Sequence, residues 1–354
     1  MRILFVTAHK YLPQMRGGLQ SSTHELCLAL MQRGHKVAVL AGLMPGGPFA
    51  VKCRVKMKFN QLAGCQVARE TGLSYPVWYA WHPWEAVARV TAKEKPDLII
   101  VLQYQSVRMA LEALKTGIPI LMQMADVNFH QHGGAFEALG NVPCVANSHF
   151  TAKKYRDAYG VCPTVIYPLV NPARYKTTIT KANITFINPH PMKGSHIAIE
   201  VARLCPEIPF AFYEAWPLSP EERAELSHKL AKLPNVALHP PRQDMRKVYA
   251  QCGVLLAPSV CEEAYGRVAT EAQINGIPVI GSTRGGLPEA IGPGGIQLDP
   301  DQPVGDWAEA TRRLWRDEAR YAALSAAALQ HAQRKEINFD HQLAAWERVI
   351  TGNR

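Results

Sequence analysis

VLLAPSVCEEAYGRVATEA, from Val254 to Ala272, is the segment that decides the fold. An apolar run leads into a loop with two adjacent acids, and a helical pattern with a further acid follows. Glu263 and Glu271 are eight residues apart, which would separate them by about 12 Å if the whole stretch were helical. With Glu263 in the loop, both carboxylates can face one ligand at the carboxyl end of the strand, where they can accept hydrogen bonds from vicinal hydroxyls. Two solvated acids are the alternative interpretation of the same spacing.

Outward from this segment, short apolar runs alternate with helical patterns along the whole chain. This alternation predicts an α/β protein whose parallel strands are covered by helices on both faces. Strands are expected at 3–6, 36–40, 98–102, 118–122 and 142–146, and again at 184–188, 209–213, 236–239, 254–258 and 278–281. Helices are expected at 21–33, 220–232, 244–251, 267–275 and 339–351.

The chain has 354 residues, which is too long for one ordinary core and favours two domains. We expect a Rossmann-like domain at 1–168, a second at 172–335, and a terminal helical segment at 336–354 that packs back on the first domain. The proline-rich stretch between the two domains is the expected linker. Open α/β sheets bind ligands beyond the carboxyl ends of their strands, so a cleft between the domains is expected to hold the site.

Charge and cysteine content narrow the possible partners. The formal net charge is +10, and the first 170 residues carry 18 Lys and Arg against 9 Asp and Glu. A basic first half suggests an anionic partner, such as a lipid headgroup, a membrane surface or an acidic acceptor, whereas no nucleic-acid-binding motif accompanies the charge. Eight scattered cysteines without a Cys-x-x-Cys pair argue against a disulfide framework or a cysteine metal site, and favour a reducing cytoplasm.

No apolar run is long enough to span a bilayer. The first residues, MRILFVTA, carry a short apolar stretch that suits a buried strand better than a signal peptide.

The deciding segment is followed by NGIPVIGS at 275–282 and GGLPE at 285–289. Together these stretches closely resemble the signature of the family-4 retaining glycosyltransferases, which have the GT-B fold. The E-x7-E motif of that family matches Glu263 and Glu271. The resemblance implies that Glu271 holds the ribose of a nucleotide donor and that Glu263 contacts the donor sugar. Retention of the anomeric configuration is implied by the resemblance alone.

Other parts of the chain match the family less strongly. Lys193 with Gly194 follows the first strand of the second domain, where the family has a lysine that neutralises the donor pyrophosphate. Gly17 and Gly18 occupy the place of the family's amino-terminal Gly-Gly loop, where a backbone can approach a phosphate or sugar closely. The remaining residues predicted to bind the donor are Tyr265, Gly266, Arg267 and His190.

Two departures from the family pattern concern the donor. The family has a histidine before an acid at the position of Ala125, so Asp126 keeps the acid without the histidine that normally lies near the donor sugar. His130 and His132 are possible substitutes, although loop histidines are more often merely exposed. The arginine that usually precedes the lysine is also absent, and His190 or Arg267 is expected to supply its charge. Both changes suggest an unusual donor, such as a 6-deoxy sugar or a pentose.

Two lesser patterns remain. VKCRVKMKF, from Val51 to Phe59, alternates between apolar and other residues, which predicts a strand with one apolar face and one face of four cations. The ordinary interpretation is a solvated face, and the sharper one is a surface for anionic lipid or an acidic acceptor. Asp299-Pro300-Asp301 has the D-x-D form of metal-dependent glycosyltransferases, but its neighbouring prolines favour a turn.

The function expected from these observations is transfer of a sugar from a nucleoside diphosphate donor to an acceptor hydroxyl. Lys193, Glu263 and Asp126 are the expected catalytic residues, and no metal or other cofactor is expected. The alternatives are a nucleotide-sugar 2-epimerase of the same architecture and a non-catalytic protein that binds nucleotide sugars.

Overall fold

The computed structural model describes residues 1–61 and 66–352. Its internal contacts divide the chain into two compact units. The first contains Met1–Ile166 together with Leu343–Arg354, and the second contains Tyr167–Gln342.

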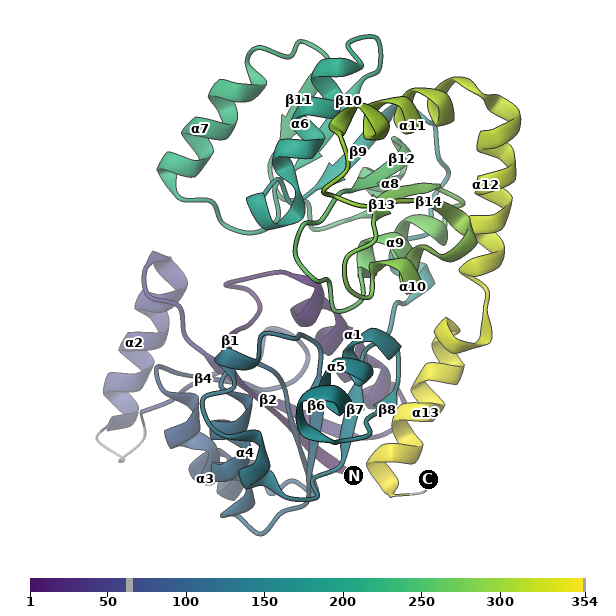
Figure 1. Ribbon diagram of the computed structural model, residues 1–354. Helices are drawn as coiled ribbons and strands as arrows, with labels where there is room; N and C mark the ends of the chain where they lie inside the picture. Colours follow the sequence, from purple (N-terminus) through teal and green to yellow (C-terminus); the bar gives the residue numbers. More distant parts are fainter. Residues whose placement is uncertain (62–65, 353–354) are drawn as a thin grey trace. The chain divides into compact units, whose positions relative to one another are not determined.

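The first unit is built on an eight-stranded sheet with the order β3-β4-β2-β1-β5-β6-β7-β8 (Figure 1). All neighbours are parallel except β3, which pairs antiparallel with β4 at one edge. The strands are β1 (Arg2–Lys10), β2 (Lys36–Gly42), β3 (Ala68–Glu70), β4 (Val77–Ala80), β5 (Leu98–Val101), β6 (Ile120–Met124), β7 (Cys144–Ala146) and β8 (Thr164–Val165).

Helices follow most strands of this unit, as parallel crossovers require. They are α1 (Gly18–Gln32), α2 (Gly47–Gln61), α3 (Pro83–Glu94), α4 (Ser106–Leu114), the 3-10 turns η1 (Phe129–Gln131) and η2 (Phe136–Leu139), and α5 (His149–Tyr159). The central strands read as continuous apolar runs because both of their faces are buried, as in Ile3-Leu4-Phe5-Val6 of β1.

The second unit has a fully parallel six-stranded sheet with the order β11-β10-β9-β12-β13-β14. Its strands are β9 (Asn183–Ile187), β10 (Phe210–Tyr213), β11 (Val236–His239), β12 (Cys252–Ala257), β13 (Val279–Ser282) and β14 (Gly295–Leu298). Its helices and 3-10 turns are η3 (Pro172–Arg174), η4 (Pro191–Lys193), α6 (Ser195–Leu204), α7 (Pro220–Leu230), α8 (Arg246–Tyr249), α9 (Arg267–Gln273), α10 (Leu287–Ile291), η5 (Gly292–Gly294), α11 (Val304–Arg316), α12 (Glu318–His331) and η6 (Lys335–Ile337).

The last helix, α13 (Phe339–Thr351), begins in the second unit, and its residues from Leu343 onward belong to the first. There Trp346 is buried, and Glu347 lies 3.6 Å from His35. The sequence prediction of two Rossmann-like parallel sheets is confirmed by the two strand orders. No helix in the described part of the chain is long and apolar enough to cross a bilayer.

The prediction of a strand from Val51 to Phe59 is wrong, because this stretch lies in helix α2. The apolar residues that alternate in the sequence belong to two opposite faces of the helix. Cys53 and Met57 are buried, whereas Val51, Val55 and Phe59 are exposed. A helix with apolar residues on both faces and cations between them produces the same alternation as a strand.

Candidate functional site

The centre of the site in the second unit is a contact between Lys193 and Glu263. Lys193 Nζ lies 2.6 Å from Glu263 Oε1, and Ser259 Oγ donates a hydrogen bond of 2.6 Å to the same oxygen. Both charged side chains are 18% exposed, so the pair is only partly shielded and a polar ligand can reach it. The structure therefore brings together two residues that are 70 positions apart and that the sequence had predicted for one site.

Backbone contacts at the carboxyl ends of β9 and β12 place this pair. Lys193 ends η4, which follows β9, and the backbone N–H groups of Val260 and Cys261 after β12 donate to Met192 O over 3.2 and 3.3 Å. Gly194 has a φ of +76°, and a Cβ there would lie 2.0 Å from Pro258 O. Only glycine permits this close approach of the two loops.

The backbone of Glu263 is held from the other side by the loop after β13. Gly286 N donates to Glu263 O over 2.6 Å, and Glu263 forms a parallel bridge with Gly285. A Cβ on Gly285 would lie 2.2 Å from Glu263 O, and its φ is +69°. Gly285 of the sequence signature is thus required to hold the loop that carries Glu263.

Aromatic rings border the Lys193 ammonium. Its Nζ lies 5.0 Å from the centroid of the Trp216 ring, within cation–π range. The His190 ring meets the same Trp216 edge to face at 5.3 Å, and His190 Nδ1 accepts a hydrogen bond from Met192 N. His190 therefore lies near Lys193 through their shared contact with Trp216, and its predicted contact with a donor stays a prediction.

Glu271 is held in a different setting, a buried ion pair with Arg267. Arg267 Nε donates to Glu271 Oε1 over 2.6 Å, and Tyr249 OH donates to Glu271 Oε2 over 2.8 Å. The two charged side chains are only 6% and 7% exposed. Arg267 also donates to Leu169 O and to Tyr175 OH, so it joins α9 to the segment that opens the second unit.

These contacts limit the roles that Arg267 and Glu271 can have in binding a donor. The Arg267 guanidinium is engaged by protein groups, so we expect it to orient Glu271 rather than to carry the charge that the family places near the lysine. A carboxylate oxygen has two lone pairs and can accept more than one hydrogen bond. The ribose contact of Glu271 stays a prediction.

Tyr265 and Gly266 shape the turn between the two glutamates. Tyr265 is 2% exposed, and its hydroxyl bonds Thr270 Oγ1 at 2.8 Å and accepts from Arg334 at 3.1 Å. Gly266 has a φ of +97°, and a Cβ there would lie 2.3 Å from Leu287 Cδ1. Both residues therefore fix the start of α9.

In the first unit, Gly17 is the N-cap of α1 and Gly18 is its first residue. A Cβ on Gly18 would meet no atom of the described chain within 4 Å, so the fold itself does not require glycine there. Close approach of a ligand to the Gly-Gly loop stays a prediction.

Replacing Gly18 with alanine is expected to leave stability unchanged or to raise it by about 0.5–1 kcal/mol, because alanine favours a helix. Donor affinity or turnover is expected to fall about ten-fold or more if a ligand approaches this backbone. Gly305→Ala, near the start of α11, is the matched control, because a Cβ there also meets nothing within 4 Å. Equal activity of the two variants would exclude the loop from the site.

Asp126 follows β6, and burial raises the pKa of its carboxyl to about 6, although Asn128 N donates to it. His132, by contrast, is a core residue. It is 3% exposed, with Nδ1 2.7 Å from Ser106 Oγ and Nε2 3.1 Å from Tyr155 OH. Burial lowers the pKa of His132 to about 4. Because both ring nitrogens are bonded inside the unit, His132 is not the exposed loop histidine that the sequence suggested.

The raised pKa of Asp126 predicts a pH dependence of stability. Between about pH 4 and pH 6 the folded protein binds a proton at Asp126 that the unfolded chain releases, so this group destabilises the fold as the pH rises. Asp126→Asn is expected to melt above the wild type at pH 8, with the difference shrinking towards pH 4. Thermal melts of both proteins across this range are the measurement, and Asp157→Asn, at an exposed position of α5, is the control. A difference that does not change with pH would contradict the raised pKa.

The sequence interpretation missed Ser259, Trp216 and Tyr249. Ser259 lies four residues before Glu263, inside the quoted motif, and could have been found there. Trp216 and Tyr249 lie on separate loops and helices of the second unit, and no local pattern marks them.

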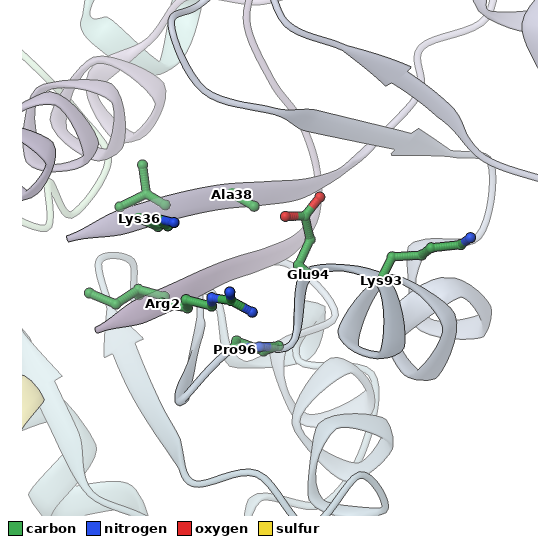
Figure 2. A pocket seen from close by; sticks show the side chains of 8 residues that line it. Arg2, Lys36, Ala38, Lys93, Glu94 and Pro96 are labelled. Atoms are coloured by element: carbon green, nitrogen blue, oxygen red, sulfur yellow. The ribbon is translucent and has the colours of Figure 1, made fainter.

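A cavity of about 260 Å³ lies in the first unit at the amino ends of strands β1 and β2 (Figure 2). Arg2 and Lys36, paired at the amino ends of β1 and β2, line it together with Glu94 at the end of α3. The Glu94 carboxylate accepts a hydrogen bond of 2.7 Å from Trp78 Nε1. None of the predicted site residues lines this cavity, which lies away from the carboxyl ends of the strands.

The D-x-D sequence forms a turn, as predicted. Gln302 N donates to Asp299 O over 3.0 Å, and Arg284 pairs with both Asp299 and Asp301. Within residues 1–61 and 66–352, no group of three or more His, Cys, Asp or Glu side chains is placed to hold a metal ion.

The two units match known protein families separately. The model of the Glycosyl transferase 4-like domain matches residues 17–164, and the model described as Glycosyl transferases group 1 matches residues 200–317. Both matches are to models of glycosyltransferase domains, one in each unit. The first match contains Gly17, Gly18 and Asp126, and the second contains Glu263 and Glu271.

Curated relatives align with part of this chain. A D-inositol 3-phosphate glycosyltransferase of Corynebacterium kroppenstedtii is 38% identical over 119 residues, which are 32% of this chain and 26% of the relative. The enzyme of that name from Rhodococcus opacus is 36% identical over 137 residues, which are 38% of this chain and 28% of the relative. The alignments thus span between a quarter and a third of these relatives' lengths.

Solved structures show the same fold over the whole chain. The Anabaena Alr3699/HepE structure in complex with UDP and glucose has a TM-score of 0.77 at 20% identity, and it covers 99% of this chain and 100% of that one. Sucrose-phosphate synthase of Thermosynechococcus elongatus has a TM-score of 0.75 at 15% identity, with 99% and 98% covered. The predicted GT-B fold class is confirmed.

Proposed function

We propose that this chain transfers a sugar from a nucleoside diphosphate sugar to an acceptor hydroxyl, with retention of the anomeric configuration. The observation that carries the proposal is the Lys193–Glu263 pair, 2.6 Å apart at the carboxyl ends of β9 and β12. Parallel sheets bind ligands at this edge. The Anabaena structures that share the fold were solved with UDP and with UDP-glucose, which supports a nucleotide-sugar donor.

In the proposed reaction, the bond between the anomeric carbon and the diphosphate oxygen breaks. The acceptor oxygen bonds to that carbon and loses its proton, for which Asp126 is the proposed acceptor. Lys193 Nζ stabilises the charge that develops on the leaving diphosphate, a form of electrostatic catalysis. Glu263 positions the donor sugar, while Glu271, oriented by Arg267, holds the ribose. Asp126, with its pKa of about 6, is the proposed catalytic residue of the first unit and suits proton transfer near neutral pH. The proposal needs no metal ion and no further cofactor.

The acceptor is proposed to be anionic or lipid-linked, because the excess positive charge is concentrated in the first 170 residues. We place the reaction in the cytoplasm. The cysteines of the described chain are all unpaired, which suits a reducing compartment.

A measurement of nucleoside diphosphate release tests the reaction. The purified chain is incubated with UDP-, GDP- and ADP-sugars, with and without an acceptor extract, and the free diphosphate is quantified. Release that depends on the acceptor is the expected result. Donor conversion to its 2-epimer without an acceptor would support the epimerase instead. Donor binding without any turnover would support the non-catalytic alternative.

A further inference from the structure

Helix α2 presents an apolar stripe to solvent, although its opposite face already packs in the first unit. Val51, Val55 and Phe59 are 55%, 47% and 72% exposed, and they recur every four residues on one side of the helix. Cys53 and Met57 face inward. An exposed line of large apolar side chains in a water-soluble fold marks an interaction surface.

Cations flank this stripe on both sides, and α2 contains no acidic residue. With 100° between successive residues, Lys52 and Lys56 lie on one flank and Arg54 and Lys58 on the other. Lys52 and Lys56 pair with Glu70 of β3 over 2.8 and 2.7 Å, which fastens that flank to the sheet. Arg54 and Lys58 have no ion pair within the described residues and remain available to an anion.

An exposed tryptophan extends the same surface. Trp81, directly after β4, is 37% exposed, and the Arg54 guanidinium lies 5.4 Å from its ring centroid. Figure 1 shows α2 at the outer edge of the first unit. Aromatic and basic side chains around an apolar stripe are the composition of a helix that lies in the interface of a membrane.

We propose that α2 docks the protein on an anionic membrane surface, with Val51, Val55 and Phe59 inserted at the level of the headgroups and Arg54 and Lys58 on lipid phosphates. Charge complementarity selects this partner, because Arg54 and Lys58 lie beside the exposed apolar stripe of a helix that contains no acid. This inference goes beyond the proposed sugar transfer, since docking needs neither donor nor acceptor.

Flotation of the full-length chain with vesicles tests the docking. Vesicles of phosphatidylcholine alone are compared with vesicles that contain about a third phosphatidylglycerol, at low and at high salt. Binding to the anionic vesicles that weakens at high salt is expected, with little binding to the neutral ones. No binding to anionic vesicles, or equal binding to both, would overturn the proposal.

Two double variants of α2, each with a matched control elsewhere on the surface, distinguish binding through this helix from effects of net charge or of total exposed apolar surface. Arg54→Glu with Lys58→Glu is expected to lower vesicle partitioning about 25-fold or more, at about five-fold for each neutralised cation. Lys93→Glu with Lys232→Glu makes the same change of net charge on exposed positions elsewhere and is expected to have a small effect.

Val55→Ser with Phe59→Ser is expected to lower partitioning at least ten-fold. Its control, Leu114→Ser with Leu329→Ser, removes two other exposed apolar side chains. Thermal melts establish that each variant folds. If folded α2 variants bind vesicles as well as their controls do, α2 is not the docking surface, and this holds whether or not the chain transfers a sugar.

Discussion

Replacing Lys193 with alanine is expected to lower kcat about 100-fold to 1,000-fold, the effect of removing one preorganised group that stabilises developing negative charge. Lys193 Nζ is the cation that Glu263 and the Trp216 ring hold at the strand ends, so its loss removes the charge without removing the loop around it. Its backbone contacts, through η4, do not depend on the side chain. Steady-state kinetics with a saturating acceptor are the measurement.

Two comparisons make this result specific to the proposed role. Lys232→Ala removes an exposed cation elsewhere in the same unit and is expected to leave kcat unchanged. Lys193→Arg keeps the charge in a different geometry and is expected to recover only part of the rate. A Lys193→Ala enzyme with unchanged kcat would show that the lysine does not stabilise the leaving group.

The second large effect is on stability. Arg267→Met removes the guanidinium that pairs with Glu271 and leaves a carboxylate that is only 7% exposed without that cation. Breaking a buried ion pair in this way costs about 3–5 kcal/mol. At roughly 2–4 °C for each kcal/mol in a domain of this size, the melting temperature is expected to fall about 10 °C.

Matched variants separate the buried pair from an ordinary surface pair. Arg203→Met breaks the exposed Arg203–Glu200 contact and is expected to leave the melting temperature almost unchanged. Arg267→Met combined with Glu271→Leu removes both charges and is expected to regain most of the stability. The double variant is expected to lose donor binding, because it lacks the carboxylate that we propose holds the ribose. If Arg267→Met melts like Arg203→Met, the buried pair does not hold α9 in place.

The parts of the site that the sequence predicted are those in which strand, loop and helix follow one another directly. Glu263 and Glu271 are carried by one continuous stretch, so their placement after β12 follows from the local pattern. Lys193 was placed correctly because it also follows a strand of the same sheet. The sequence identified Gly285 as part of a motif but could not explain why a glycine is needed there. The reason is its close contact with the Glu263 backbone, which only the structure shows.

The remaining features depend on contacts between distant residues. Arg267 reaches Leu169 and Tyr175, more than 90 positions upstream, and no local pattern encodes that contact. The burial of His132 depends on Ser106 and Tyr155, which approach it from α4 and α5. Helix α2 was mistaken for a strand because it has apolar residues on two faces. The sequence interpretation expects a surface helix to have one apolar face, which is buried.

A thermal-shift titration with nucleoside diphosphates and their sugars tests the central claim most directly, because it needs no acceptor. A ligand at 100 times its dissociation constant contributes about 2.7 kcal/mol to the stability of the protein that binds it. We therefore expect one diphosphate to raise the melting temperature of the wild type by about 5–10 °C and that of Lys193→Ala by much less. If no diphosphate or nucleotide sugar raises the melting temperature of the wild type, the account of this site is wrong.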